Sequence, residues 1–223
     1  MTNIQKRIFT SIIILPLSFF FILRGGYFLL FFLLSVFFIA NYELFSVFNK
    51  KSTVLLLNLI LILSLFSIYN LRDDPNSFNL LLWIIILVIC SDVGGYFFGK
   101  IFKWKKITKI SPKKTLSGVF GSFIFSLLSI FIAEIILPLP TSFFGSTIFL
   151  EINFLEPKFF FLAIIFSLVA QIGDLTISYF KRIEKVKDTG KILPGHGGIL
   201  DRIDGLMFVA ILVFILKKIN IIP

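Results

Sequence analysis

This sequence of 223 residues has only one cysteine, Cys90, and one histidine, His196. A single cysteine excludes an intrachain disulfide framework and a cysteine-rich metal site, and a single histidine excludes a multi-histidine metal site. Charged residues are also scarce, at 15% of the chain. Apolar residues are abundant instead: 57% are hydrophobic, 31 are phenylalanine, and the mean hydropathy is +1.00. Soluble domains carry a smaller apolar fraction, so this composition indicates a membrane protein.

The apolar residues lie in long uncharged runs. About 20 apolar residues in a helix cross the hydrocarbon layer, because each residue rises about 1.5 Å. The runs predict an all-α fold, a polytopic transmembrane helical bundle of about seven spans. We expect one integral membrane domain over 1–223, with N-terminal spans in 8–99 and a catalytic C-terminal part in 91–218. The predicted spans are 8–23, 27–48, 53–70, 78–99, 115–137, 158–180 and 203–218, of which the first two could instead form one re-entrant hairpin.

Positive charge is unevenly distributed between the segments that join these spans. Alternation puts 17 of the 22 Lys and Arg residues on one side, in segments 1–7, 49–52, 100–114 and 181–202. Basic residues favour the cytoplasmic side of a membrane protein. We therefore expect a multi-pass protein of the cell (inner) membrane, with its chemistry on the cytoplasmic face. The net charge is +10, and its distribution indicates that the basic residues interact with membrane lipid and not with nucleic acid. The other five, Arg24, Arg72, Lys158, Lys217 and Lys218, fall on the opposite side, and the last two are the weak point of this assignment.

Two carboxylates lie inside predicted spans. A carboxylate at a helix centre costs about 2.5–3.5 kcal/mol on insertion scales. Asp92 and Asp174 each lie about two helical turns from the basic end of a span, too deep for a short side chain to reach water. Pairing with a lysine or capping of a helix would be a purely structural explanation. Glu43 and Glu134 lie nearer to span ends, where Glu43 fits a solvated or structural role.

Helical spacing gives Asp174 a polar neighbourhood. Residues three or four apart share one helix face, which aligns Gln171, Asp174, Ser178 and Lys181. This stripe has oxygen ligands at depth and a cation near the surface, as suits a metal–phosphate site.

Glycines and acids follow in the segment 181–204. Gly195, Gly197 and Gly198 allow backbone N–H groups to converge on an anion. The helix that begins after them also favours negative charge at its N-terminus. Asp201 and Asp204, three residues apart, could form an oxygen-rich Mg²⁺ site with Asp174.

The order of residues from Ser178 to Asp204 resembles the signature of the phosphatidate cytidylyltransferase (CDP-diacylglycerol synthase) family. It is Ser-x-Phe-Lys-Arg, four residues, Lys-Asp, then Pro-Gly-His-Gly-Gly-x-x-Asp-Arg-x-Asp. Residues 92–99 are similar to that family's Asp-x-x-x-Tyr-Phe-x-Gly segment, and 111–115 to its Ser-Pro-Lys-Lys-Thr motif. Ser117 departs from the family, many of whose members have an acidic residue there. The chain is also shorter than most members, so we expect it to lack some of their N-terminal spans.

The resemblance implies transfer of a cytidylyl group from CTP to phosphatidic acid, giving CDP-diacylglycerol and pyrophosphate in phospholipid biosynthesis. It implies Mg²⁺, with a monovalent cation such as K⁺ beside it. Metal ligands would be Asp174, Asp201 and Asp204. The implied catalytic residues are these three with Lys181, Arg182, Lys187, Asp188, His196 and Arg202. The implied substrate-binding residues are Asp92, Ser111, Lys113, Lys114, Thr115, Ser178, Gly197 and Gly198.

Two rival functions stay open at this point. A CTP-using polyprenol or phytol kinase would transfer the terminal phosphate instead, and a transporter or channel would also place carboxylates in spans.

The lipid phosphate is already an anion at neutral pH and needs no strong base. A role for His196 in binding substrate or in shaping the loop is therefore expected ahead of a role in proton transfer. The oligomeric state is open as well, with a homodimer as one option.

Overall fold

A computed structural model describes residues 3–75, 77–108, 111, 114–137, 152–190, 192–195 and 197–222. Seven α-helices make up its regular structure, and the described residues contain no strand beyond two isolated bridges. Each predicted span matches one helix to within a few residues, so the predicted fold is confirmed. The helices are α1 Asn3–Arg24, α2 Gly26–Val47, α3 Lys51–Asp73, α4 Phe78–Phe102, α5 Leu116–Ile136, α6 Pro157–Ile183 and α7 Leu200–Lys218.

Five helices, α2 to α6, are long and apolar enough to cross a membrane by length and composition. The apolar part of α1, Phe9–Arg24, is shorter. α7 carries charged residues in its first and last turns. The protein is therefore a helical, multi-pass membrane protein.

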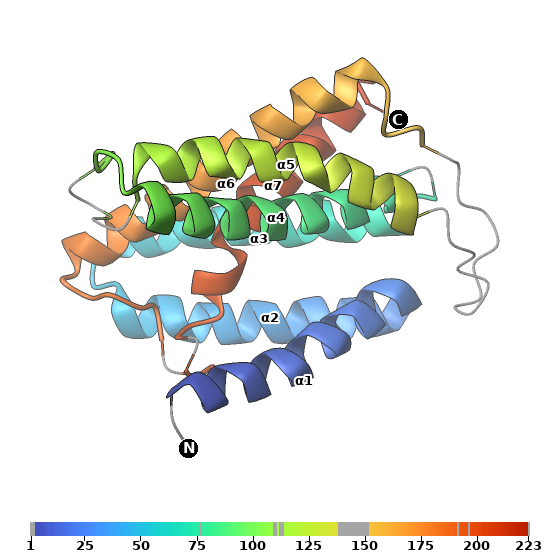
Figure 1. Cartoon of the computed structure of the whole chain (residues 1–223). Helices are drawn as coiled ribbons and strands as arrows, with labels where there is room; N and C mark the ends of the chain where they lie inside the picture. Colours follow the sequence, from blue (N-terminus) through green and yellow to red (C-terminus); the bar gives the residue numbers. More distant parts are fainter. Residues whose placement is uncertain are drawn as a thin grey trace.

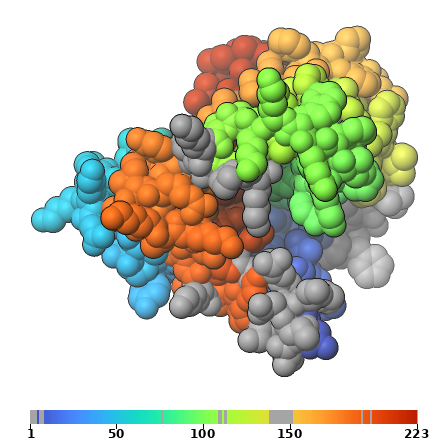
Figure 2. All heavy atoms as spheres, turned by 60° about the vertical axis from the view of Figure 1, so that its left-hand side comes forward, coloured from blue at the N-terminus to red at the C-terminus, as the bar shows by residue number. Residues whose placement is uncertain are grey.

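Successive helices run in opposite directions (Figure 1). The start of α1, the turn between α2 and α3, and the described residues of the segments 103–115 and 184–199 all lie at one end of the bundle, on the left of Figure 1. The alternation expected from the charge pattern is thus observed. Figure 2, which brings this end forward, shows orange atoms of the segment after α6 and green atoms from the start of α5 on the same face of the molecule. We call this end the basic end.

The tightest packing in the bundle is between α4 and α5. A Cβ atom on Gly121 would lie 2.5 Å from the Gly94 carbonyl oxygen, so only glycine allows this approach. The Ser122 hydroxyl also donates to the Ser91 carbonyl oxygen at 2.8 Å. Close packing of these two helices fixes where Asp92 lies relative to the start of α5.

Two apolar clusters form the core. The larger one contains Trp83 with three phenylalanine rings around it, and the Trp83 indole donates to Ser129 Oγ at 3.2 Å. The smaller cluster includes Ala40 and Leu44 of α2, and it reaches Ile177 of α6 and Met207 of α7. This second cluster packs the N-terminal helices against the two helices that carry the signature residues.

Candidate active site

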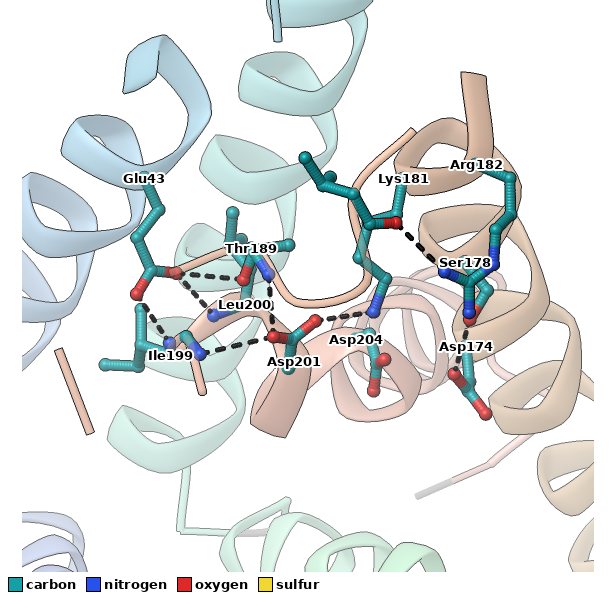
Figure 3. Close-up of polar contacts among 12 residues, drawn as sticks. Glu43, Asp174, Ser178, Lys181, Arg182, Thr189, Ile199, Leu200, Asp201 and Asp204 are labelled. Carbon is teal, nitrogen blue, oxygen red and sulfur yellow. Dashed lines mark hydrogen bonds and ion pairs between the residues drawn. The ribbon is translucent and has the colours of Figure 1, made fainter. Parts of the chain in front are cut away.

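The polar stripe predicted around Asp174 lies on one continuous helix. α6 extends to Ile183, three residues beyond the predicted span. Ser178 Oγ donates to Asp174 Oδ1 at 3.2 Å, which confirms that these two side chains share a face (Figure 3). Asp174 and Ser178 therefore lie on the part of α6 that leads to the basic end.

Lys114 connects the basic segment 100–114 to this polar stripe. Its Nζ lies 2.6 Å from Asp174 Oδ2 and donates to the Gln171 carbonyl oxygen at 3.3 Å. Both partners of the ion pair are partly exposed, at 22% for Lys114 and 37% for Asp174. Ion pairs at such exposure contribute little to stability. Lys114 is therefore able to exchange this carboxylate for another anion at small cost.

A second lysine–aspartate pair is almost completely buried. Lys181 Nζ lies 2.6 Å from Asp201 Oδ1, with 8% and 6% of the two side chains exposed. The other oxygen, Oδ2, accepts hydrogen bonds from the backbone N–H groups of Thr189 at 2.8 Å and Gly198 at 3.2 Å. Both oxygens of Asp201 are thus used inside the protein, at the start of α7 (Figure 3).

Three other aspartates lie within electrostatic range of one another. Asp92 of α4 and Asp204 of α7 each feel the negative charge of Asp174, and Asp204 also feels that of Asp92. Positive charges act on them as well, from Lys114 and Arg202 on Asp92 and from Lys181 on Asp204. Neither forms an ion pair with a described basic residue. Asp92 is exposed, and Asp174 and Asp204 are partly exposed. Three helices therefore contribute carboxylates to one region near the basic end.

This arrangement bears on the predicted metal ligands. Carboxylate oxygens are the donors that Mg²⁺ prefers, so the chemistry of the residues fits a divalent cation. In the described part of the chain, however, no group of three or more His, Cys, Asp or Glu side chains lies close enough to hold a metal ion. Asp201 in particular is held by Lys181 and the loop backbone, whereas Asp92, Asp174 and Asp204 lie only within electrostatic range of one another. The expected triad of Asp174, Asp201 and Asp204 is not brought together.

The glycine-rich segment forms a tight hairpin. Leu193 and Gly197 exchange backbone hydrogen bonds of 3.0 and 3.1 Å, and Gly195 and Gly197 have φ values of +79° and +88°. These left-handed conformations favour glycine. Because the N–H groups of Gly197 and Gly198 both donate within the protein, their observed role is to shape the loop. Binding of a phosphate by these groups stays a prediction.

The remaining predicted residues occupy the surface of the basic end or lie outside the described residues. Arg182, Lys187, Asp188 and Arg202 are exposed, and Arg182 Nη1 donates to the Val186 carbonyl oxygen at 2.9 Å. The Ser111 N–H donates to Thr108 Oγ1 at 3.2 Å. His196 and Lys113 lie outside the described residues.

Thr115 has an observed structural role. It is the N-cap of α5, where its hydroxyl oxygen accepts a hydrogen bond from the Gly118 N–H at 3.2 Å. Ser117, in the first turn of the same helix, is buried and within 3.0 Å of Thr115 Oγ1. The departure from the family pattern at Ser117 therefore falls on a packed position.

Glu43 is a residue whose contacts the sequence did not predict. It is buried in α2 and accepts hydrogen bonds from the loop between α6 and α7, residues 184–199, called the α6–α7 loop below (Figure 3). Of the two expectations for Glu43, the structural one is confirmed. Its position inside an apolar run was the only signal in the sequence, and that signal does not identify partners 146 to 157 residues away.

The fold and this site define a class: a polytopic helical membrane protein with lysines and aspartates gathered at one end of its bundle. Comparison with known families then places the chain within that class. It belongs to the Cytidylyltransferase family, whose model matches residues 51–220.

Similar proteins include three named phosphatidate cytidylyltransferase. One from Rickettsia conorii is 33% identical over 97% of this chain and 92% of its own length. One from Helicobacter pylori is 36% identical over 66% of this chain and 49% of its own, and one from Staphylococcus saprophyticus is 40% identical over 67% and 52%. The chain thus spans about half the length of the Helicobacter and Staphylococcus relatives and nearly all of the Rickettsia one.

Proposed function

We propose that this chain transfers a cytidylyl group from CTP to phosphatidic acid, giving CDP-diacylglycerol and pyrophosphate. The observation that carries the proposal is the meeting of Lys114 with Asp174, beside Asp92 and Asp204. Cation and carboxylates from separate parts of the chain converge where a charged nucleotide and a lipid phosphate would both be accessible. Membership of the family and the names of the relatives support the same reaction.

In the proposed reaction, an oxygen of the lipid phosphate attacks the α-phosphorus of CTP. A new P–O bond forms, the bond between the α- and β-phosphates breaks, and pyrophosphate leaves with that electron pair. The attacking oxygen is already an anion, so no proton has to be removed. The barrier comes from repulsion between two polyanions, which fixed positive charges reduce by positioning and by stabilising charge in the transition state.

Four basic residues of the basic end are the proposed phosphate ligands. Lys114 is within reach of Asp174 and partly exposed, and Arg182, Lys187 and Arg202 are exposed. Lys181 differs because it is buried against Asp201. We therefore assign Lys181 to holding the start of α7 and the other four to the phosphate groups of CTP.

A divalent cation such as Mg²⁺ is part of the proposal. Mg²⁺ is commonly held by one or two carboxylates together with substrate phosphates. Of the predicted ligands, Asp174 and Asp204 would supply those carboxylates, whereas Asp201 stays with Lys181. When bound, the cation would neutralise phosphate charge. A monovalent cation such as K⁺ beside it belongs to the same proposal.

The proposed location is the cell (inner) membrane, with the basic end on the cytoplasmic face. Segments rich in Lys and Arg favour that side, and CTP is supplied there. Phosphatidic acid would arrive laterally from the membrane lipid. A homodimer stays a prediction.

An assay of purified protein in detergent with radiolabelled CTP, phosphatidic acid and Mg²⁺ tests the proposal. We expect labelled CDP-diacylglycerol and one equivalent of pyrophosphate. Asp174→Asn should abolish turnover, whereas Asp73→Asn, at an exposed position at the opposite end, should leave it unchanged. Activity of Asp174→Asn near that of the wild type would remove Asp174 from the mechanism. Release of CDP instead of pyrophosphate would indicate a CTP-dependent lipid kinase.

A further inference from the structure

The α6–α7 loop is attached to the N-terminal part of the chain at three points. Near its start, Glu184 accepts hydrogen bonds from the side chain of Asn49 at 2.9 Å and from its backbone N–H at 3.3 Å. In its middle, the Thr10 hydroxyl donates to the Pro194 carbonyl oxygen at 2.9 Å. At its end lies Glu43. All three anchors precede residue 51, where the match to the family model begins.

Glu43 caps the helix that carries Asp201 and Asp204. Its Oε1 accepts a hydrogen bond from the Ile199 N–H at 2.8 Å, and its Oε2 accepts one from the Leu200 N–H at 3.1 Å. The first N–H groups of a helix have no partner within the helix. The N-cap residue of α7, Ile199, supplies no side-chain cap of its own. A carboxylate from α2 therefore satisfies the start of α7, where its negative charge is also favourable.

Two glycines leave room for this carboxylate. A Cβ atom on Gly190 would lie 2.6 Å from Glu43 Oε1, and one on Gly198 would lie 2.5 Å from Oε2. Glu43 is only 1% exposed, so it has no space to move aside. The glycines on both sides of the loop therefore fit the carboxylate as well as the turn.

One residue connects Glu43 to the buried pair of the site. Thr189 donates through Oγ1 to Glu43 Oε2 at 3.2 Å, and through its backbone N–H to Asp201 Oδ2 at 2.8 Å. Asp201 in turn holds Lys181 of α6. A continuous path of hydrogen bonds thus leads from α2 to the two helices that carry Asp174 and Asp204 (Figure 3).

We propose that Glu43 is a positioning residue for the cytidylyl transfer. It sets the α6–α7 loop and the first turn of α7 so that Lys187 and Arg202 bind CTP together with Arg182 at the end of α6. Glu43 touches no reacting atom in this role. The inference rests on the proposed function for its effect on CTP, while the anchoring itself is a property of the fold.

The test compares Glu43→Gln with Glu134→Gln. Glu134 is a matched control, because its Oε2 also accepts a backbone N–H, that of Phe154 at 3.0 Å, but at the opposite end of the molecule. Hydrogen–deuterium exchange would follow the amides of Ile199 and Leu200. We expect exchange to be about tenfold faster in Glu43→Gln for two reasons. Hydrogen bonds to a charged carboxylate are replaced by weaker ones to a neutral amide, and the NH₂ group of that amide cannot accept a hydrogen bond from the donors around it. Glu134→Gln should leave these amides unchanged.

Kinetics separates positioning from loss of folded protein. A partly unfolded sample lowers the maximal rate but leaves the KM for CTP unchanged. We expect Glu43→Gln to raise the KM for CTP about tenfold, because misplaced basic residues bind the nucleotide more weakly, with the KM for phosphatidic acid unchanged. Unchanged amide exchange, or an unchanged KM for CTP, would overturn the inference.

A second variant and the exchange experiment cover the cases in which Glu43→Gln does not fold or the wild-type protein is inactive. If Glu43→Gln does not fold, Thr189→Val carries the same two measurements, because it removes only the Oγ1 bond to Glu43 and keeps the backbone bond to Asp201. If the wild-type protein makes no CDP-diacylglycerol, the proposed function fails. The exchange experiment then decides on the anchoring by itself.

Discussion

Lys181 and Asp201 form an ion pair with Nζ and Oδ1 2.6 Å apart, and less than a tenth of either side chain is exposed. The pair joins the end of α6 to the start of α7, across a loop of 16 residues from 184 to 199. Asp201 also accepts two backbone hydrogen bonds from that loop. The pair therefore ties the two ends of the loop together. Each buried charge is compensated mainly by the other, because little water reaches either.

Breaking this pair should destabilise the protein. We expect Lys181→Met to lower the free energy of unfolding by about 3 kcal/mol, because removing one partner leaves an uncompensated buried charge. Thermal unfolding in detergent measures the change. Lys158→Met is the matched control: Lys158 pairs with Glu156 at the same distance of 2.6 Å, but both are nearly half exposed. That variant should lose less than about 1 kcal/mol. Equal losses in the two variants would contradict the role of burial.

Lys114 should show the reverse pattern, with a small effect on stability and a large one on CTP. Lys114→Gln removes a partly exposed ion pair, so unfolding should change by less than about 1 kcal/mol. The KM for CTP should rise about tenfold or more, because one positive charge for the phosphates is lost. Steady-state kinetics at varied CTP measures it. Lys106→Gln, an exposed lysine of the same segment, should have a KM for CTP like that of the wild type. A large loss of stability in Lys114→Gln would instead make Lys114 structural.

Gly198→Ala should disrupt the start of α7. The added Cβ atom would overlap Thr189 Oγ1 and lie 2.5 Å from Glu43 Oε2, in a buried region without room to adjust. We expect a loss of about 3 kcal/mol or more in thermal unfolding, as for other overpacked core sites. Gly26→Ala is the comparison: Gly26 has φ +53° but no atom within 4 Å of an added Cβ, so only backbone strain of about 1 kcal/mol is expected. Should the two variants unfold alike, the crowding around Gly198 would not matter.

The orientation of the bundle can be read from labelling of single cysteines. In a Cys90→Ser background, Lys50→Cys and Lys187→Cys place thiols at exposed positions of the basic end, and Lys158→Cys places one at the other end. We expect a membrane-impermeant maleimide to label Lys158→Cys in intact cells, and the other two only after the membrane is opened. Labelling in the opposite order would place the basic end outside the cytoplasm.

The helices and their alternation were predictable because both depend on local properties. The predicted span 78–99 is apolar and long enough to form a membrane helix by its own composition. The spacing of Asp174 and Ser178 likewise fixes a shared helix face, and their hydrogen bond confirms it. The segment 178–204 also carries the family signature, which depends only on residue order.

The partners of the charged residues were not predictable in the same way. Asp201 was expected beside Asp174 because carboxylates at the start of the last helix could share a Mg²⁺ site with it, yet Asp201 binds Lys181 and the loop backbone. Asp174 instead pairs with Lys114, 60 residues earlier. Which of several aspartates meets which lysine depends on the rotation and depth of each helix, and these are decided by packing such as the close approach of Gly94 and Gly121.

The sequence by itself thus determined a bundle of membrane helices, the gathering of its basic segments at one end, and the family signature. Periodicity, hydrophobicity and charge bias act within a single segment, so they can be read without knowing the neighbours. Only the tertiary structure decided that Glu43 would cap α7 and that Asp201 would close the α6–α7 loop. These contacts join residues far apart in the chain, and burial removes the water that would otherwise solvate each charge, so the partner is fixed by which groups the packed helices leave within reach.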